Sequence, residues 1–231
     1  MNTNERTDMN EKKTDFTRQL GFYFDASRCT GCKTCAVACR DKNGVGVDRA
    51  FRRVLENAGG SWEKDDAGAW RQNVFAYYVS VSCNHCEDPL CTRVCPTGAH
   101  AKHPEKGGLV LIDEKKCVGC GNCSYACPYG APQYDVEKKK MTKCDGCLDR
   151  LEEGRLPACV EACPQRALDF GPVEELRRRY GEGALIAPLA REEYSRPNLV
   201  VRGCRGAEPA VDRTFDRTGF EKAYGGPFER K

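Results

Sequence analysis

The fold is decided by the stretch Cys29-Thr30-Gly31-Cys32-Lys33-Thr34-Cys35-Ala36-Val37-Ala38-Cys39. Its cysteines have the spacing C-x2-C-x2-C-x3-C. The same spacing recurs, with a proline behind it, at Cys117, Cys120, Cys123, Cys127 and Pro128. This run is a ligand pattern for iron-sulfur clusters, in which the fourth cysteine ligates the other cluster of a pair. The two runs therefore predict clusters that exchange ligands between cysteine groups.

Two further groups repeat the pattern with one gap lengthened. Eleven residues separate Cys147 from Cys159, for example, and a longer surface loop between fixed ligands costs little free energy. The second group is Cys83, Cys86, Cys91 and Cys95 before Pro96, and the fourth is Cys144, Cys147, Cys159 and Cys163 before Pro164. Of the 17 cysteines only Cys204 is left over, and we expect it to be a spare thiol.

Closely spaced thiolates bind iron-sulfur clusters or zinc. Three cysteines on a tight loop can wrap three corners of a cubane, while the fourth lies on a short helical turn that a following proline ends. A structural zinc takes its ligands from two separated knuckles, which suits compact runs of four cysteines poorly. A disulfide framework is disfavoured in a protein of 231 residues with an odd cysteine count and no evident signal sequence. The pattern favours clusters.

The apolar content is modest, because the 40% hydrophobic fraction includes the 17 cysteines. We therefore expect metal binding to supply much of the folding free energy. The net charge of +3 gives no argument for a nucleic-acid partner. No run approaches the roughly 20 apolar residues that span a bilayer, and the polar stretch Met1 to Leu20 is expected to be neither a Sec nor a twin-arginine leader.

Short alternating runs at Gly21–Asp25, Val74–Val81, Leu109–Asp113 and Ala167–Phe170 predict strands. A helix is predicted over Val173–Tyr180. The repeated unit of strand, cysteine loop and short helix predicts an α+β fold of two bacterial two-cluster ferredoxin-like modules with inserted loops and a C-terminal extension.

The cysteine groups also suggest domain boundaries, if the first group is nested with the fourth and the second with the third. The first module then takes residues 20–60 and 140–172, and the second takes residues 61–139. A polar N-terminal tail at 1–19 precedes them, and a C-terminal helix with an extended tail occupies 173–231.

With these motifs in place, the sequence resembles the iron-sulfur subunit of bacterial anaerobic dimethyl sulfoxide reductase, within the molybdopterin oxidoreductase family. The resemblance extends from about residue 20 to about residue 200. It is carried by the stretches at 27–35, 51–53, 58–60, 62, 72–78, 82–89, 127–134, 141–147 and 166–172. Arg40 follows Cys39 where the bare ferredoxin motif has proline, and this departure also looks like the reductase subunit.

The resemblance implies four 4Fe-4S clusters with nested ligands, which we call sites A to D. Site A takes Cys29, Cys32, Cys35 and Cys163; site B takes Cys144, Cys147, Cys159 and Cys39; site C takes Cys83, Cys86, Cys91 and Cys127; site D takes Cys117, Cys120, Cys123 and Cys95. In related nitrate reductase subunits a tryptophan stands at the position of Cys120 and that cluster has three irons. The cysteine here implies four.

The sequence shows no nucleotide fingerprint, P-loop or activated nucleophile, so we expect a non-catalytic electron-transfer subunit. The resemblance implies a heterotrimer in anaerobic respiration, in which electrons pass from a quinol-oxidising membrane subunit to a molybdopterin catalytic subunit reducing dimethyl sulfoxide or related S- or N-oxides. The protein would be peripheral at the cytoplasmic membrane through its partners, with the side left open. The alternatives are a sister complex for tetrathionate, thiosulfate, polysulfide or formate, or a soluble polyferredoxin carrier.

Five aromatic or imidazole side chains near the cysteine groups carry weaker expectations. His85 lies between two ligands, where it either tunes a cluster by hydrogen bonding or is a plain turn residue. His100 and His103 follow the second group, where they either approach a quinol-facing edge or, as is commoner, lie on a surface loop. Trp62 and Trp70 are expected to pack against their module.

Overall fold

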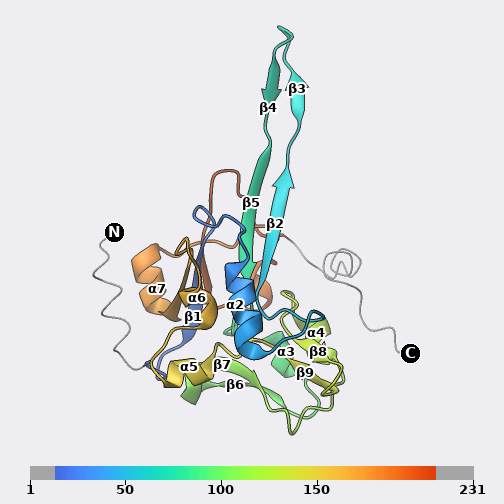
Figure 1. Ribbon diagram of the computed structural model, residues 1–231, viewed down its shortest axis with the longest axis vertical. Coiled ribbons are helices and arrows are strands. Elements are labelled where there is room, and N and C mark those ends of the chain that lie inside the picture. The colour runs from blue at the N-terminus through green and yellow to red at the C-terminus, as the bar shows by residue number, and fades with distance from the viewer. Residues whose placement is uncertain (1–13, 212–231) are drawn as a thin grey trace.

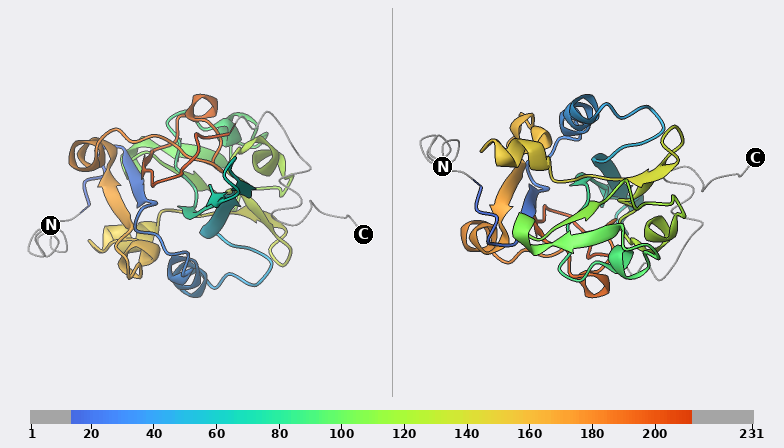
Figure 2. Two further views of the ribbon diagram at one scale, coloured as in Figure 1. Left: turned by 90° about the horizontal axis from the view of Figure 1, so that it is seen from above. Right: turned by 90° about the horizontal axis from the view of Figure 1, so that it is seen from below.

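The computed structural model describes residues 14–211. A three-stranded sheet brings together strands from the beginning and the end of this range. Strand β1 (Leu20–Asp25) is central, antiparallel to β10 (Leu168–Pro172) and parallel to β11 (Leu199–Arg202). Both views of Figure 2 show the blue β1 beside the orange β10. The predictions for the N-terminal tail and the end of the sequence lie outside the described residues at 1–13 and 212–231.

All six residues of β1 are buried, because both faces of this sheet are covered. On one face α7 (Val173–Tyr180) packs Val173 and Leu176 against Tyr23 and Val200. Phe22 and Phe24 join the main core on the other face, where the rings of Phe22 and Phe170 meet edge to face at 4.7 Å. The apolar run of β1 thus reflects a strand buried on both sides.

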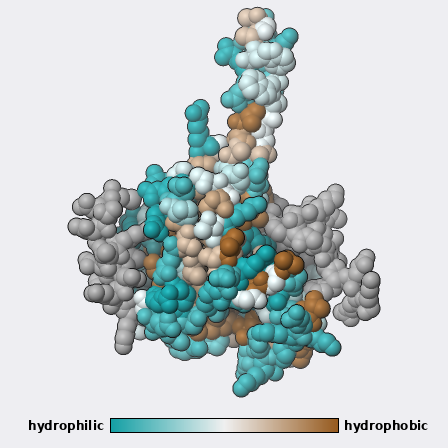
Figure 3. Space-filling view, in the orientation of Figure 1, coloured by the Kyte–Doolittle hydropathy of each residue, from teal (hydrophilic) through white to brown (hydrophobic). Residues whose placement is uncertain are grey.

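A long hairpin stands out from the body (Figure 1). Strand β2 (Arg53–Gly59) pairs with β5 (Phe75–Val81), and the same ribbon continues as β3 (Trp62–Lys64) paired with β4 (Trp70–Gln72). We call residues 53–81 the arm. Its outer part is free of the body in the space-filling view (Figure 3). Trp62 and Trp70 are 62% and 61% exposed, so the expectation that they pack against a module is wrong.

Short helices and two more hairpins form the rest of the body (Figure 1). The helices are α2 (Thr34–Asn43), α3 (Leu90–Arg93), α4 (Asn122–Ala126), α5 (Leu148–Glu152) and α6 (Ala158–Glu161), with 3-10 turns at Pro104–Lys106 and Glu192–Tyr194. The hairpins are β6 (His100–His103) with β7 (Leu109–Ile112), and β8 (Gln133–Asp135) with β9 (Lys140–Thr142). Helices of four or five residues are too short to persist alone, so tertiary contacts must hold them.

The predicted strands are confirmed with ends displaced by one or two residues, and the predicted helix is confirmed with the same ends. The described part of the segment after α7 also belongs to the core. Leu185, Ile186, Leu189 and Ala190 are buried, and β11 completes the sheet. None of the helices within residues 14–211 is long and apolar enough to cross a bilayer.

Candidate iron-sulfur sites

Tight left-handed turns shape the loops that carry the cysteines. Gly31 has a φ of +70°, and a Cβ there would lie 2.6 Å from the ring of Tyr78 on β5. Gly119 has the same φ, and a Cβ there would lie 2.5 Å from the carbonyl oxygen of Lys139. Only glycine fits both the turn and the close approach at these two positions. The first loop is therefore seated on the base of the arm.

The cysteines of site A line one hollow. It is bounded by Cys29, Cys32, Cys35 and Cys163, together with Phe24, Val54, Ser80 and Leu168. Cys35 lies in the first turn of α2, whereas Cys163 follows α6 and is distant from Cys35 in the sequence. Four soft sulfur donors around an apolar hollow suit an iron-sulfur cluster.

The cysteines of site D line a second hollow. It is bounded by Cys95, Cys117, Cys120 and Cys123, with Ile112 and Met141 completing the wall. The backbone N–H of Met141 donates to the Cys117 sulfur at 3.4 Å. Burial raises the pKa of the Cys123 thiol to about 12, with smaller contributions from the charges of Cys117, Cys120 and Cys95. These four sulfurs are thus electrostatic neighbours.

The cysteines of site B are all buried and come from three helices and a loop. Cys39 lies on α2, Cys147 caps the start of α5, Cys159 lies on α6 and Cys144 follows β9. Burial is the main cause of the raised pKa of the Cys39 thiol, and Cys144, Cys159 and Cys147 add to the shift. The first and fourth cysteine groups therefore meet in space.

The cysteines of site C join the second and third groups. Cys83 and Cys86 follow β5, Cys91 lies on α3 and Cys127 caps the end of α4. Burial raises the pKa of the Cys91 thiol, with further contributions from Cys127, Cys83 and Cys86. The second and third cysteine groups therefore also meet in space.

Burial is graded along the four sites. Cys32 in site A and Cys120 in site D are exposed, whereas site B is fully buried. Neighbouring sites are close enough to interact electrostatically, Cys35 with Cys159 and Cys144 with Cys83. Cys91 of site C shares a hydrophobic cluster with Cys123 of site D. The two exposed cysteines therefore belong to the first and last sites in the order A, B, C, D.

Several groups outside the cysteine motifs donate hydrogen bonds to the ligand sulfurs. The Ser195 hydroxyl donates to Cys86 at 3.3 Å, and the backbone N–H of Ala167 donates to Cys163 at 3.3 Å. Hydrogen bonds to sulfur are among the means by which proteins set cluster potentials. Sequence reasoning missed Ser195, which lies in the C-terminal segment far from any motif.

The histidines near sites B, C and D are more buried than expected. His85 is fully buried with a φ of +43°, and its Nδ1 accepts the Val110 N–H at 3.0 Å. Its other nitrogen, next to Gly146 of the site B loop, has no hydrogen-bond partner among the described atoms. His85 is thus a turn residue whose ring also faces a cluster loop.

His100 lines the hollow of site D and is 2% exposed, so its placement on a surface loop is wrong. Burial, with a smaller effect of Lys143, lowers its pKa to about 3, and the ring is neutral near pH 7. His103 is partly exposed, and its Nδ1 lies 2.8 Å from a carboxylate oxygen of Glu105. Cys204 is half-buried just after β11, and burial raises its pKa.

Residues 74–173 match the family described as a 4Fe-4S dicluster domain. The sequence is 55% identical over 198 residues to the probable anaerobic dimethyl sulfoxide reductase chain YnfG of Escherichia coli, covering 86% of this protein and 95% of that one. The identity and both coverages are the same for the B component of the anaerobic dimethyl sulfoxide reductase of that organism. The corresponding B component of Haemophilus influenzae is 56% identical over 184 residues, covering 80% and 89%.

Fold and sites together define an electron-transfer protein that carries multiple 4Fe-4S clusters. Within that class, the protein belongs to the family of the iron-sulfur B components of anaerobic dimethyl sulfoxide reductases. The resemblance stated from the motifs is confirmed. The protein is a subunit without a catalytic site of its own, and its role is to move electrons.

Proposed function

We propose that this protein relays electrons through four 4Fe-4S clusters, from a quinol-oxidising membrane subunit to a molybdopterin catalytic subunit that reduces dimethyl sulfoxide or related S- or N-oxides. The observation that carries the proposal is the graded burial of the thiols. Exposed cysteines lie at sites A and D, all four cysteines of site B are buried, and those of site C are buried or half-buried. Such an order lets electrons enter at one surface and leave at another.

The ligand sets A to D are part of the proposal, and the hollows and the electrostatic neighbours of the thiols support them. Each set combines three cysteines of one group with one cysteine of its nested partner. When bound, each cubane accepts and donates one electron at a time. The protein's own residues place the clusters, shield the inner two from solvent more than the outer two and donate hydrogen bonds to sulfur.

The two-module organisation and its boundaries, 20–60 with 140–172 and 61–139, also belong to the proposal. Sites A and B lie in the first module, and sites C and D in the second. The family suggests that the first module faces the catalytic subunit and the second faces the membrane. The exposed arm is consistent with this direction, because its base carries the Tyr78 ring on which the site A loop rests. The protein would be peripheral at the cytoplasmic membrane through these partners.

The experiment is to tag the protein, purify it anaerobically with its partners, and measure dimethyl-sulfoxide-dependent oxidation of a reduced viologen. Activity in a molybdenum-containing complex supports the whole proposal. A brown complex that is inactive with this oxidant would keep the relay and move the protein to a sister complex. A brown protein without partners would point to a soluble carrier.

A sister complex is an alternative because the sequence is also similar to a relative that is named for a different activity. The B component of the sulfite dehydrogenase of Allochromatium vinosum is 38% identical over 174 residues, covering 68% of this protein and 70% of that one. The substrate offered in the assay, dimethyl sulfoxide as electron acceptor or sulfite as electron donor, therefore decides between the reductase and this relative.

A further inference from the structure

Arg52 places a guanidinium inside the core, with only 2% of the residue exposed. Its Nη1 donates to the Ser80 hydroxyl at 3.1 Å and its Nη2 to the Ser82 hydroxyl at 2.8 Å. Its central carbon lies 4.6 Å from the centroid of the Phe22 ring. Its Nε has no hydrogen-bond partner among the described atoms.

No carboxylate within residues 14–211 forms an ion pair with Arg52. Burying a charge without a counter-charge is expensive, so a buried cation is normally paired. The guanidinium cannot relieve this cost by losing its proton. The structure therefore needs an anion beside Arg52 that the carboxylates do not supply.

Cysteines of two proposed cluster sites are the electrostatic partners of this cation. Its strongest charge interactions are with Cys159, Cys35, Cys144 and Cys39. Cys35 belongs to site A, and the other three belong to site B. Ser80 connects the cation to site A directly, because its hydroxyl also lies 3.4 Å from the Cys35 sulfur.

We propose that Arg52 is a fixed cation at the junction of sites A and B that raises the reduction potentials of both clusters. The inference rests on the proposed ligand sets. A cubane held by four thiolates is an anion, and reduction adds one more negative charge. A buried positive charge stabilises the reduced form more than the oxidised form, with little screening by solvent. It also weakens the repulsion between two neighbouring clusters that are both reduced.

A second buried cation lies at the next junction. Lys143 is 7% exposed, its Nζ donates to the carbonyl oxygen of Cys144 at 2.8 Å, and it also contacts that of Val110. It interacts with Cys83 and Cys91 of site C and with Cys144 of site B. Within the described residues it too forms no ion pair with a carboxylate. Lys143 thus plays the corresponding role between sites B and C.

The test is an EPR redox titration of the complex purified with its partners, combined with iron analysis. Arg52→Gln removes the first cation, and Arg52→Lys keeps the charge. Lys143→Met and Lys143→Arg form the matching pair at the second junction. Arg71→Gln is the control, because it removes an equal charge from a side chain that is 78% exposed on the arm.

We expect Arg52→Gln to shift the potentials of two clusters to more negative values and leave the other two in place. Lys143→Met should likewise shift two, one of them shared with the first pair. Arg52→Lys, Lys143→Arg and Arg71→Gln should stay near the wild-type potentials. Unchanged potentials in Arg52→Gln at full iron content would overturn the proposal. So would equal shifts in Arg52→Gln and Arg52→Lys, which would indicate packing instead of charge.

If Arg52→Gln loses the clusters of sites A and B, the charge-preserving variant Arg52→Lys shows whether the positive charge is what matters. Restoration of the two missing signals by Arg52→Lys supports the cation, whereas loss in both variants contradicts it. The iron content of the wild-type complex tests the proposed function independently of the variants. A content too low for four 4Fe-4S clusters would refute the ligand sets before any variant is compared.

Discussion

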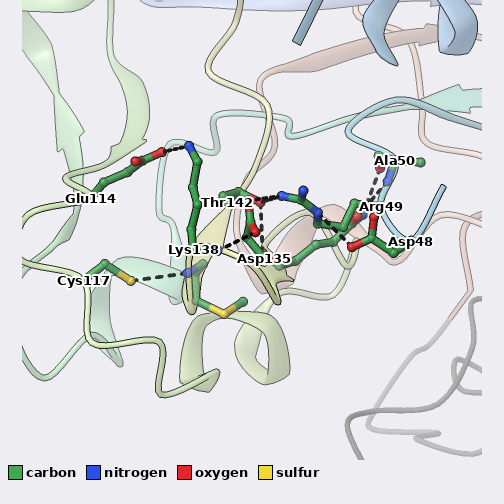
Figure 4. Close-up of polar contacts among 10 residues, drawn as sticks. Asp48, Arg49, Ala50, Glu114, Cys117, Asp135, Lys138 and Thr142 are labelled. Atoms are coloured by element: carbon green, nitrogen blue, oxygen red, sulfur yellow. Dashed lines mark hydrogen bonds and ion pairs between the residues drawn. The ribbon is translucent and has the colours of Figure 1, made fainter. Parts of the chain in front are cut away.

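The guanidinium of Arg49 donates to the carboxylate of Asp135 at 2.6 Å, across 86 residues of sequence. Both side chains are largely shielded from solvent, and Arg49 also donates to the Thr142 hydroxyl at 3.2 Å (Figure 4). Arg49 lies just before the arm, and Asp135 and Thr142 lie on the β8–β9 hairpin. The contact therefore joins the segment after the first cysteine group to the hairpin before the fourth.

Replacing Arg49 with methionine should destabilise the cluster-loaded protein by about 1.5–3 kcal/mol, since hydrogen bonds to charged groups are lost and Asp135 keeps a shielded charge. Thermal unfolding measures the effect. Arg71→Met is the control, because its pair with Asp65 is exposed on the arm and should contribute little. Equal unfolding temperatures for the two variants would contradict a role for the Arg49 contact.

The contribution of Asp135 should depend on pH. The backbone N–H of Lys138 holds its pKa below the ordinary value of 3.8, and Arg49 lowers it further. A depressed carboxyl pKa contributes stability above the unfolded value, and that stability disappears as the pH falls through the folded value. The difference in stability between wild type and Asp135→Asn should therefore be constant near neutral pH and shrink below about pH 4. A difference that persists unchanged into strong acid would contradict this origin.

Cys120→Ser should convert the cluster at site D to a three-iron form, because one exposed ligand is lost while Cys95, Cys117 and Cys123 remain. EPR of the oxidised variant would show the new signal. Cys204→Ser is the matched control and should keep every wild-type signal, since Cys204 belongs to none of the four sites. An unchanged oxidised spectrum for Cys120→Ser would refute the ligand set of site D.

Ser195→Ala should shift the potential of the site C cluster to a more negative value, because a hydrogen bond from the hydroxyl to the Cys86 sulfur stabilises the reduced form. A redox titration followed by EPR checks this. Ser61→Ala removes an exposed hydroxyl on the arm that bonds to Glu63, and should leave all potentials unchanged. If both variants titrate as the wild type does, the Ser195 bond has no electronic effect.

Removal of iron should abolish cooperative unfolding. Many ligand thiols lie in the core, among them Cys35, Cys159 and Cys163, so cluster binding and core formation are coupled. Calorimetry of protein stripped by a chelator under reducing conditions should show no sharp transition, and reconstitution should restore it. A sharp transition in metal-free protein would mean that the apolar contacts suffice.

The cysteine spacing predicted that the cysteine groups exchange ligands, whereas the choice of which groups pair is implied only by the resemblance. The alternation of residues along each segment predicted strands β1, β5, β7 and β10, because this pattern is local to the segment. The outer arm escaped prediction because its residues are exposed on both sides, so Trp62 and Trp70 give no inward-facing pattern. The positions of Arg52 and Lys143 escaped because charged residues are rarely buried.

Strand β1 lies between β10 and β11, which are made at the other end of the described residues. On the ribosome, β1 emerges while both of its neighbours are still unsynthesised, and Cys29 waits in the same way for Cys163. The central sheet and the outermost cluster site are therefore completed only when translation has passed most of the sequence. Maturation of this protein is a late event, and a polypeptide cut short before β11 would expose the edge of β1 to other unfinished copies.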